Sequence, residues 1–211
     1  MAAQNDGEIM IFTVLTAAVI VAVCYVIGSI PTAYLVVKKI KGIDIRTVGS
    51  GNVGASNAAR VLGKWGFIGV LFADMMKGFI PVMILKHFYG ESWLVLIGAV
   101  ALIIGHSFTC FLKFKGGKGV ATGVGVFLAL APFQLLIAAF IFGIMLAVFQ
   151  MVSLGSVTAA AFLAVMVWFG SEWNHLRYIT VVIALLIIWL HRGNIARIVR
   201  GEERKVGKRT S

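Results

Sequence analysis

Residues 9–27 read IMIFTVLTAAVIVAVCYVI, a run without a single charged side chain. An α-helix rises about 1.5 Å per residue, so this run is long enough to cross the roughly 30 Å of hydrocarbon in a bilayer. Asp6 and Glu8 come just before it, where a cleaved signal peptide would carry basic residues. The stretch therefore predicts a transmembrane helix and not a cleaved signal.

The composition of the whole chain indicates the same apolar solvent. Hydrophobic residues make up 60% of the 211 positions and charged residues only 13%, against about half and about a quarter in soluble domains. So few charged residues could not cover so much apolar surface, which excludes a water-soluble globule. The apolar content also excludes a disordered chain, and two cysteines are too few for a disulfide scaffold.

Six further apolar runs follow the first. With it they predict an all-α integral membrane protein of seven transmembrane helices, in which residues 1–211 form a single membrane-embedded domain. Between the fourth and fifth runs, Ala131-Pro132 either interrupts one helix or separates two, and proline in the first turn of a new helix is the less costly arrangement. The six runs lie at about residues 65–85, 93–112, 119–131, 133–151, 155–169 and 178–190.

The 19 Lys and Arg residues are unevenly distributed. With the amino terminus outside, the cytoplasmic segments are residues 38–64, 113–118 and 192–211, which hold six, three and seven of the basic residues. Cytoplasmic loops are enriched in Lys and Arg, so this bias predicts an outside amino terminus and a cytoplasmic carboxyl terminus. The net charge of +11 thus follows the loops, and we expect no nucleic-acid partner.

The first cytoplasmic segment contains Gly49-Ser50-Gly51-Asn52-Val53-Gly54, followed by Arg60. Glycine lets backbone amides turn toward an anion without a Cβ in the way, and arginine can hold phosphate through two parallel hydrogen bonds. The composition is explained equally well by an anion cradle and by a flexible loop that ends in a helix cap, with Arg60 meeting lipid headgroups.

The second segment, Phe114-Lys115-Gly116-Gly117-Lys118-Gly119, leads directly into an apolar run. Free amides at the start of a helix, with Lys118 beside them, would capture phosphate. A tight basic turn between two spans is the alternative. Leu112 and Gly119 stand where a nucleotide-binding P-loop needs its first glycine and its Ser or Thr, so nucleotide hydrolysis is disfavoured.

Two further cytoplasmic segments carry pairs of polar side chains at i and i+3, a spacing that places each pair on one helical face. The pairs are Ser153 with Ser156 and His191 with Asn194. If the spans form a bundle, these faces can converge with the two glycine-rich segments at one depth. A lone histidine at a helix end is by itself more often a partner of the helix dipole or of lipid headgroups than a catalyst.

Asp74 and Lys77 lie three residues apart within the second predicted span. Ionisable groups at that depth are costly and are candidates for function. Because each can neutralise the other, a mutual ion pair that braces the helices is the favoured role. No cluster of His, Cys, Asp and Glu has metal-ligand spacing, so we expect neither a metal nor another cofactor.

Three classes of function fit a membrane protein with these elements. A small organophosphate or anion transporter would use Asp74 and Lys77, but transporters usually show internal repeats and a site near the bilayer midplane. The polar elements gather on one side instead, which favours an enzyme. A noncatalytic scaffold would leave the glycine-rich segments without a purpose.

Taken in order, these elements resemble the bacterial acyl-phosphate:glycerol-3-phosphate acyltransferases, the PlsY family, over essentially the whole chain. Asp74 with Lys77-Gly78 fits the family's second span, whereas Thr109 and Gly155 depart from its usual residues. The resemblance rests on Gly49-Ser50-Gly51-Asn52 with Asn57 and Arg60, Gly105-His106 leading to residues 114–122, Ser153-Leu154 with Ser156, and His191-Arg192-x-Asn194 followed by Glu203 and Lys205.

The resemblance implies an enzyme that moves a fatty acyl group from acyl phosphate to the 1-hydroxyl of glycerol 3-phosphate, giving lysophosphatidate and phosphate, the first acylation of bacterial phospholipid synthesis. It implies the bacterial inner membrane as location, with the active site facing the cytoplasm. The expected partners are the two substrates, membrane lipid and a peripheral enzyme that supplies acyl phosphate. The chain itself is expected to be a monomer.

The resemblance also implies roles for individual residues. Gly116, Gly117, Lys118 and Gly119 would bind the phosphate of glycerol 3-phosphate. Ser50, Gly51, Asn52 and Arg60 would hold the acyl-phosphate head and stabilise charge on the carbonyl oxygen. Ser153, Ser156, His191 and Asn194 would orient the attacking hydroxyl or the donor, and Glu203 would brace the basic tail, because ion pairing lowers a carboxyl pKa.

Overall fold

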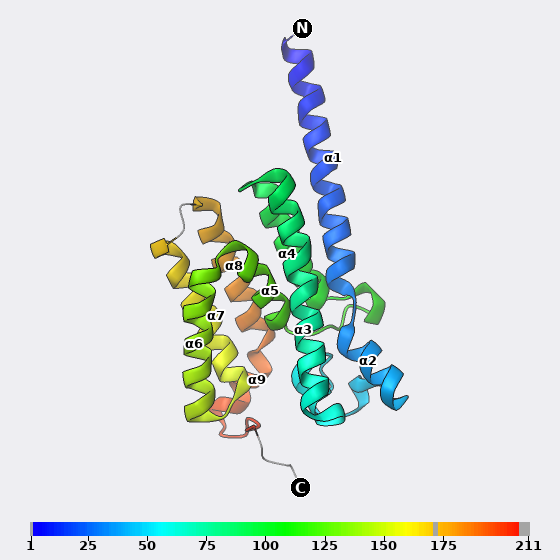
Figure 1. Cartoon of the computed structure of the whole chain (residues 1–211), viewed down its shortest axis with the longest axis vertical. Helices are drawn as coiled ribbons and strands as arrows, with labels where there is room; N and C mark the ends of the chain where they lie inside the picture. The colour runs from blue at the N-terminus through cyan, green and yellow to red at the C-terminus, as the bar shows by residue number, and fades with distance from the viewer. Residues whose placement is uncertain (1, 171–172, 207–211) are drawn as a thin grey trace. The chain divides into compact units, whose positions relative to one another are not determined.

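The computed structural model describes residues 2–170 and 173–206, and every regular element in these ranges is a helix (Figure 1). The chain forms two compact units, Met1–Val126 and Phe127–Ser211. The interpretation of residues 1–211 as one membrane domain stays a prediction. Lys208 and Arg209, two of the basic residues predicted for the cytoplasmic tail, lie outside the described residues.

In the first unit, α1 and α4 run side by side (Figure 1). Glycines allow the two backbones to touch: a Cβ added at Gly28 would overlap the carbonyl oxygen of Leu102, and one at Gly105 would overlap that of Tyr25. The elements of this unit are α1 (Ala2–Ser29), α2 (Thr32–Lys41), the 3-10 turn η1 (Ile45–Thr47), α3 (Ala55–Tyr89), α4 (Trp93–Ser107), the 3-10 turn η2 (Cys110–Leu112) and the first turns of α5 (Val120–Leu130).

Helix α3 is not continuous in direction. Gly63 has φ 70° and ψ −161°, a backbone conformation that interrupts a right-handed helix and that glycine adopts without strain. Residues 55–62 therefore form a short helix of their own before the long span begins. This short helix carries Arg60.

Buried apolar side chains join the two glycine-rich segments at one place in the first unit. Ile45 lies four residues before the first segment, Val53 lies within it, and Leu112 lies two residues before the second. Both segments are therefore built on the same apolar cluster. The buried members of this cluster are Ala33, Val37, Ile45, Val53, Ala55, Ala58, Val70 and Leu112.

Helix α5 starts against the middle of α3. A Cβ added at Gly78 would overlap the carbonyl oxygen of Thr122, and one added at Gly125 would overlap that of Met75. The two backbones meet closely because no side chain separates them at these positions. The contact brings the first turns of α5 next to the part of α3 that carries Asp74.

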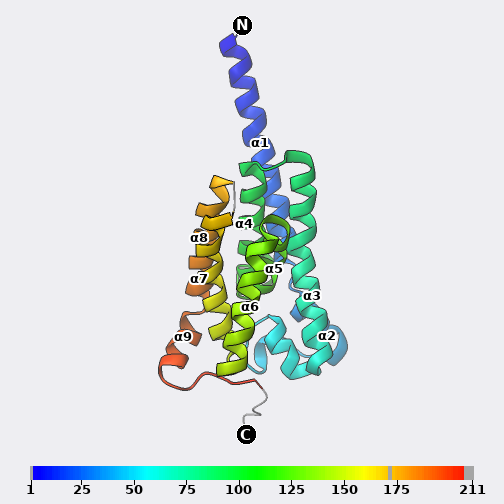
Figure 2. The ribbon, with the colours of Figure 1, turned by 60° about the vertical axis from the view of Figure 1, so that its left-hand side comes forward.

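The second unit is built from helices that pack against their neighbours in sequence (Figure 2). Helix α8 leads into α9 through a bend of 58° at His191. The two-helix interpretation of Ala131-Pro132 is confirmed, since α5 ends at Leu130 and Pro132 stands in the first turn of α6. The elements are α6 (Pro132–Phe149), α7 (Val152–Gly170), α8 (Asn174–Leu190) and α9 (Arg192–Val199).

Each of the seven predicted apolar runs contains a helix, although the run at 93–112 extends past the end of α4 at Ser107 into the 3-10 turn η2. Among the described residues, five helical segments are long and apolar enough to cross a membrane, and α8 with α9 would make a sixth. Helix α5 has only 11 residues. The count of seven spans and the outside amino terminus stay predictions. Large apolar side chains such as Phe12, Phe140 and Phe169 are exposed, as expected where helices face lipid.

Candidate active site

The first loop, residues 49–60, folds around two glycines. Gly49 and Gly51 have φ of 62° and 70°, in the left-handed region that side chains rarely adopt. They place Ser50 at an exposed tip between them. The loop closes on itself, since the amide of Gly51 donates to the carbonyl of Val48 at 3.0 Å.

The side chain of Asn57 holds this loop through hydrogen bonds to its backbone. Its side chain is 1% exposed, and its Oδ1 accepts from the amide of Ser50 at 2.9 Å. Its Nδ2 donates to the carbonyls of Ile45 and Val48 at 3.1 and 3.0 Å. One buried amide group therefore satisfies three backbone groups of the loop. No role was predicted for Asn57, although it lies in the polar, glycine-rich stretch on which the family resemblance partly rests.

These bonds concern the anion cradle, one of the two interpretations that the composition left open. The amides of Ser50 and Gly51 already donate within the protein, so these two amides are not available to an anion. Arg60 lies beside the loop tip, because a Cβ added at Gly49 would come within 3.2 Å of Arg60 Cδ. Ser50, Asn52 and Arg60 are all at least partly exposed.

The second loop, residues 114–119, differs from its prediction in the same way. The amide of Gly116 donates to the carbonyl of Ser107, and the amide of Gly117 to that of His106, both at 3.0 Å. The expectation of free amides at these two glycines was therefore wrong. The reason is tertiary: the loop folds back and pairs with the last carbonyls of α4, which lack partners within the helix.

The end of the second loop leads directly into a helix, as the predicted phosphate site requires. Gly119 has φ of 77°, and α5 begins at Val120 directly after it. The first amides of a helix have no partner within the helix and carry its positive dipole end. Lys118 stands beside them and is partly exposed. The predicted direct passage from loop to helix is thus confirmed.

Asp74 and Lys77 form the predicted ion pair, with Asp74 Oδ1 and Lys77 Nζ 2.7 Å apart. Their side chains are 1% and 8% exposed. Lys77 Nζ also donates to the carbonyl of Ile30, between α1 and α2, at 2.8 Å. The pair therefore ties α3 to the first two helices.

In the second unit, Glu203 accepts hydrogen bonds from two predicted site residues, Ser153 and Asn194, and from Arg197. Its Oε1 accepts from Ser153 Oγ at 2.7 Å and from Asn194 Nδ2 at 2.6 Å, while its Oε2 accepts from Arg197 Nε at 2.8 Å. Burial raises the pKa of Glu203, but the three hydrogen bonds outweigh burial and hold the pKa below its ordinary value. The predicted bracing role of Glu203 agrees with these contacts.

The other polar residues of the second unit bond to their own helices. Ser156 Oγ donates to the carbonyl of Val152 at 2.8 Å, and His191 Nδ1 lies 2.8 Å from the carbonyl oxygen of Ile187. Both residues are buried. Their predicted roles in orienting a substrate stay predictions.

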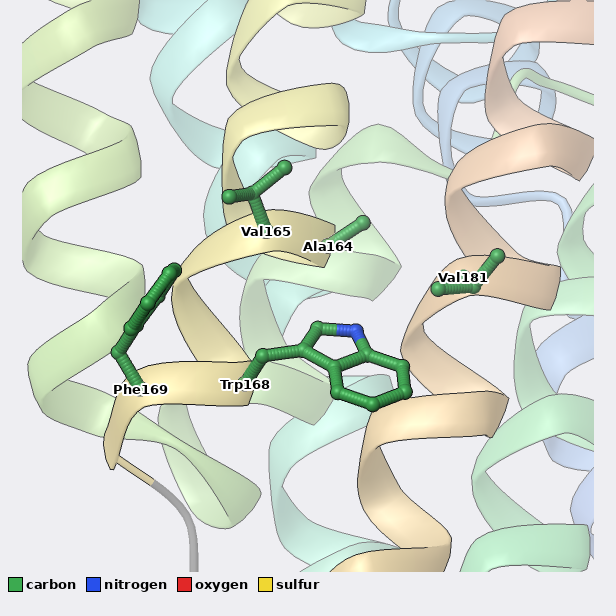
Figure 3. A pocket seen from close by; sticks show the side chains of 5 residues that line it. All are labelled: Ala164, Val165, Trp168, Phe169 and Val181. Carbon is green, nitrogen blue, oxygen red and sulfur yellow. The ribbon is translucent and has the colours of Figure 1, made fainter.

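A shallow hollow on the second unit is a different kind of surface (Figure 3). Ala164, Val165, Trp168, Phe169 and Val181 line it, from α7 and α8. These side chains provide neither a cation nor a hydroxyl that could hold phosphate. The candidate active site therefore does not lie there.

Comparisons with known proteins agree with the predicted resemblance. A family model described as Glycerol-3-phosphate acyltransferase matches residues 18–201. The chain is 42% identical over 191 residues to the glycerol-3-phosphate acyltransferase of Prochlorococcus marinus (strain MIT 9312), a match that covers 90% of this chain and 97% of that protein.

Two crystal structures of PlsY (YgiH), an integral membrane glycerol 3-phosphate acyltransferase, share the fold. The glycerol 3-phosphate form has a TM-score of 0.85 and 40% identity, and the match covers 90% of this chain and 96% of that chain. The lysophosphatidic acid form has a TM-score of 0.84 and 38% identity, with 90% and 95% covered.

Proposed function

Because the chain belongs to the glycerol-3-phosphate acyltransferase family, we propose that it transfers a fatty acyl group from acyl phosphate to the 1-hydroxyl of sn-glycerol 3-phosphate. The products are 1-acyl-glycerol 3-phosphate, which is lysophosphatidate, and inorganic phosphate. The chain is an all-helical integral membrane acyltransferase. Its proposed place is a bacterial inner membrane, with the active site facing the cytoplasm.

One observation carries the proposal. The two related crystal structures are a glycerol 3-phosphate form and a lysophosphatidic acid form of one enzyme. Lysophosphatidic acid is glycerol 3-phosphate with one added acyl group, so the two forms represent the acceptor before and after acylation. The acyl donor is the one that the family resemblance implies; as an activated mixed anhydride, an acyl phosphate can transfer its acyl group without prior activation by the protein.

The proposed reaction is a direct acyl transfer. The 1-hydroxyl oxygen of glycerol 3-phosphate attacks the carbonyl carbon of the donor, and the bond from that carbon to the bridging oxygen breaks. The phosphate leaves with the bonding electron pair and takes up the hydroxyl proton, so no strong protein base is required. A good leaving group also removes the need for a nucleophilic serine.

The first unit supplies the proposed phosphate contacts. Lys118 and the first amides of α5 bind the phosphate of glycerol 3-phosphate. Ser50, Asn52 and Arg60 bind the acyl-phosphate head, and Arg60 stabilises the charge that develops on the carbonyl oxygen. The glycines determine the shape of the loops. Gly51 and Gly119 adopt a left-handed φ, and Gly116 and Gly117 allow the loop backbone to approach α4 closely.

Both substrates fit a membrane enzyme open to the cytoplasm. The donor is amphipathic and the acceptor is a small water-soluble dianion, so the site must receive one from lipid and the other from water. We propose a monomer that receives acyl phosphate from a peripheral enzyme. A carrier of glycerol 3-phosphate is the competing function.

The test uses purified protein in detergent with acyl phosphate and radiolabelled glycerol 3-phosphate. Equal amounts of lysophosphatidate and phosphate are expected. Exchange of labelled glycerol 3-phosphate across vesicles without any chemical product would establish a carrier instead.

Two variants test the residue assignments. Lys118→Ala is expected to raise KM for glycerol 3-phosphate by about 10-fold or more, as for the loss of a charged hydrogen bond. Arg60→Ala is expected to lower kcat, and full turnover in this variant would remove its charge-stabilising role. Lys39→Ala, an exposed lysine on α2, is the control for a general loss of positive charge.

A further inference from the structure

A chain of buried polar side chains lies beneath the second loop. Lys77 and Asp74 on α3, His106 on α4 and Thr122 on α5 follow one another through contacts of 2.7 Å, 3.8 Å and 3.1 Å. We propose that His106 is a positioning residue for the acceptor phosphate. Its ring contacts the backbone of Gly117, and this contact determines the positions of Lys118 and of the start of α5.

No side-chain atom fits between Gly117 and the ring of His106. A Cβ added at Gly117 would overlap Nε2 of His106 and would lie 2.9 Å from Cε1 and 3.0 Å from Cδ2. The edge of the imidazole therefore lies directly against the Gly117 backbone. The amide of Gly117 donates to the carbonyl of the same histidine at 3.0 Å. One residue of α4 thus holds Gly117 through its ring and through its backbone.

The ring is itself held from the other side. Nδ1 of His106 lies 3.1 Å from Thr122 Oγ1 and 3.8 Å from Asp74 Oδ1. Thr122 is fully buried, and His106 is 7% exposed. The imidazole cannot rotate away without breaking a buried hydrogen bond, which costs about 1–3 kcal/mol when a partner is left unsatisfied.

Thr122 couples this support to the phosphate-binding end of α5. It lies in the first turn of that helix, two residues after Val120, so the group that fixes the imidazole also fixes the direction of the helix amides. The loop and the helix start are therefore aligned by one side chain. The inference rests on the proposed function, because it assumes that this loop and this helix end bind the acceptor.

The test is a double-mutant cycle between positions 106 and 117. Gly117→Ala places a methyl group into the imidazole, and we expect kcat/KM for glycerol 3-phosphate to fall by about 100-fold, the cost of a displacement of about 1 Å in an active site. His106→Asn keeps a polar atom near Nδ1 for Thr122 but removes the outer ring, and we expect KM for glycerol 3-phosphate to rise by about 10-fold with little change in kcat.

The double variant H106N/G117A distinguishes positioning from independent damage. The methyl group then occupies space that the ring has vacated, so the double variant is expected to stay within about 10-fold of H106N alone, well above the product of the single effects. Losses that multiply would overturn the proposal, and so would wild-type kinetics in G117A.

Folding and function can be separated in this experiment. If G117A does not accumulate as a monodisperse protein, the thermal midpoint and yield of the double variant report the same coupling, and failure of H106N to restore either one overturns the proposal. Coupling that changes KM for acyl phosphate instead of KM for glycerol 3-phosphate would support the positioning role and refute the assignment of the acceptor to this loop. Gly69→Ala, at an open position of α3, is the matched control.

Discussion

Replacement of Glu203 by glutamine should weaken the docking of the segment that follows α9 onto α9 itself. Glutamine keeps one carbonyl oxygen, which can still accept from Ser153 and Asn194. Its amide nitrogen replaces the oxygen that accepts from Arg197 Nε at 2.8 Å, so two donors would face each other. A hydrogen bond to a charged group contributes about 1.5–3 kcal/mol.

The size of the effect follows from that contact. The Glu203 side chain is 6% exposed but that of Arg197 is 40% exposed, so solvent partly screens the pair and the lower half of that range applies. A loss of about 2 kcal/mol raises the undocked fraction by about 30-fold, since each 1.36 kcal/mol corresponds to a factor of ten. Where opening and closing are fast, proteolysis follows that fraction. Tryptic cleavage after Arg204, measured by mass spectrometry, should accelerate by the same factor.

The neighbouring Glu202 offers a matched control. It pairs with Arg200 at 2.9 Å, but the two side chains are 59% and 60% exposed. Exposed pairs contribute about 0–1 kcal/mol, so Glu202→Gln should change the cleavage rate by about fivefold at most. Cleavage of E203Q at the wild-type rate, or no faster than E202Q, would refute the bracing role.

Three other predictions concern the remaining buried contacts. Asn57→Asp should inactivate the enzyme more than Asn57→Ala, because a carboxylate would meet two backbone carbonyls that now receive hydrogen bonds; acyl-transfer rates that are equal in both variants would contradict this. Asp74→Leu or Lys77→Met alone should lower stability by about 3–5 kcal/mol, and the double variant by less than either, as measured by thermal unfolding in detergent. The pKa of Glu203 is lowered in the folded protein, so its contribution to stability is present above the ordinary glutamate pKa and is lost as pH falls through the lower folded value. A fluorophore at position 206 should therefore become mobile only when the pH falls below that ordinary value. Mobility that begins near neutral pH would contradict the direction of this pKa shift.

The helices could be predicted from the sequence because apolar runs have few alternatives in a bilayer. The start of α6 at Pro132 and the pairing of Asp74 with Lys77 follow from local rules, namely the place of proline in a first turn and the i, i+3 spacing. The break at Gly63 was not predicted: this glycine lies in the predicted cytoplasmic segment 38–64, just before the apolar run at 65–85, and a single glycine there is compatible with a straight helix.

The two candidate loops are irregular segments between helices, as predicted, but their hydrogen bonds were not predicted. The bonds from Gly116 and Gly117 to the end of α4 join residues about ten positions apart, and no local pattern encodes them. Asn57 and His106 belong to the pattern that resembles the family but were assigned no role, because each acts through a tertiary contact with a glycine. A polar residue that follows or precedes a glycine-rich segment is the signal that could have identified them.

The internal bonding of both loops has a consequence for repeated turnover. Ordering a backbone costs about 1–2 kcal/mol per residue in conformational entropy, and here that cost is met during folding and not at each encounter with substrate. When phosphate departs, the amides of Ser50, Gly51, Gly116 and Gly117 lose no partner, because their acceptors belong to the protein. Under the proposed assignment of both loops to the substrate phosphates, the emptied site therefore keeps these four bonds, and the next pair of reactants meets a backbone that is already ordered there.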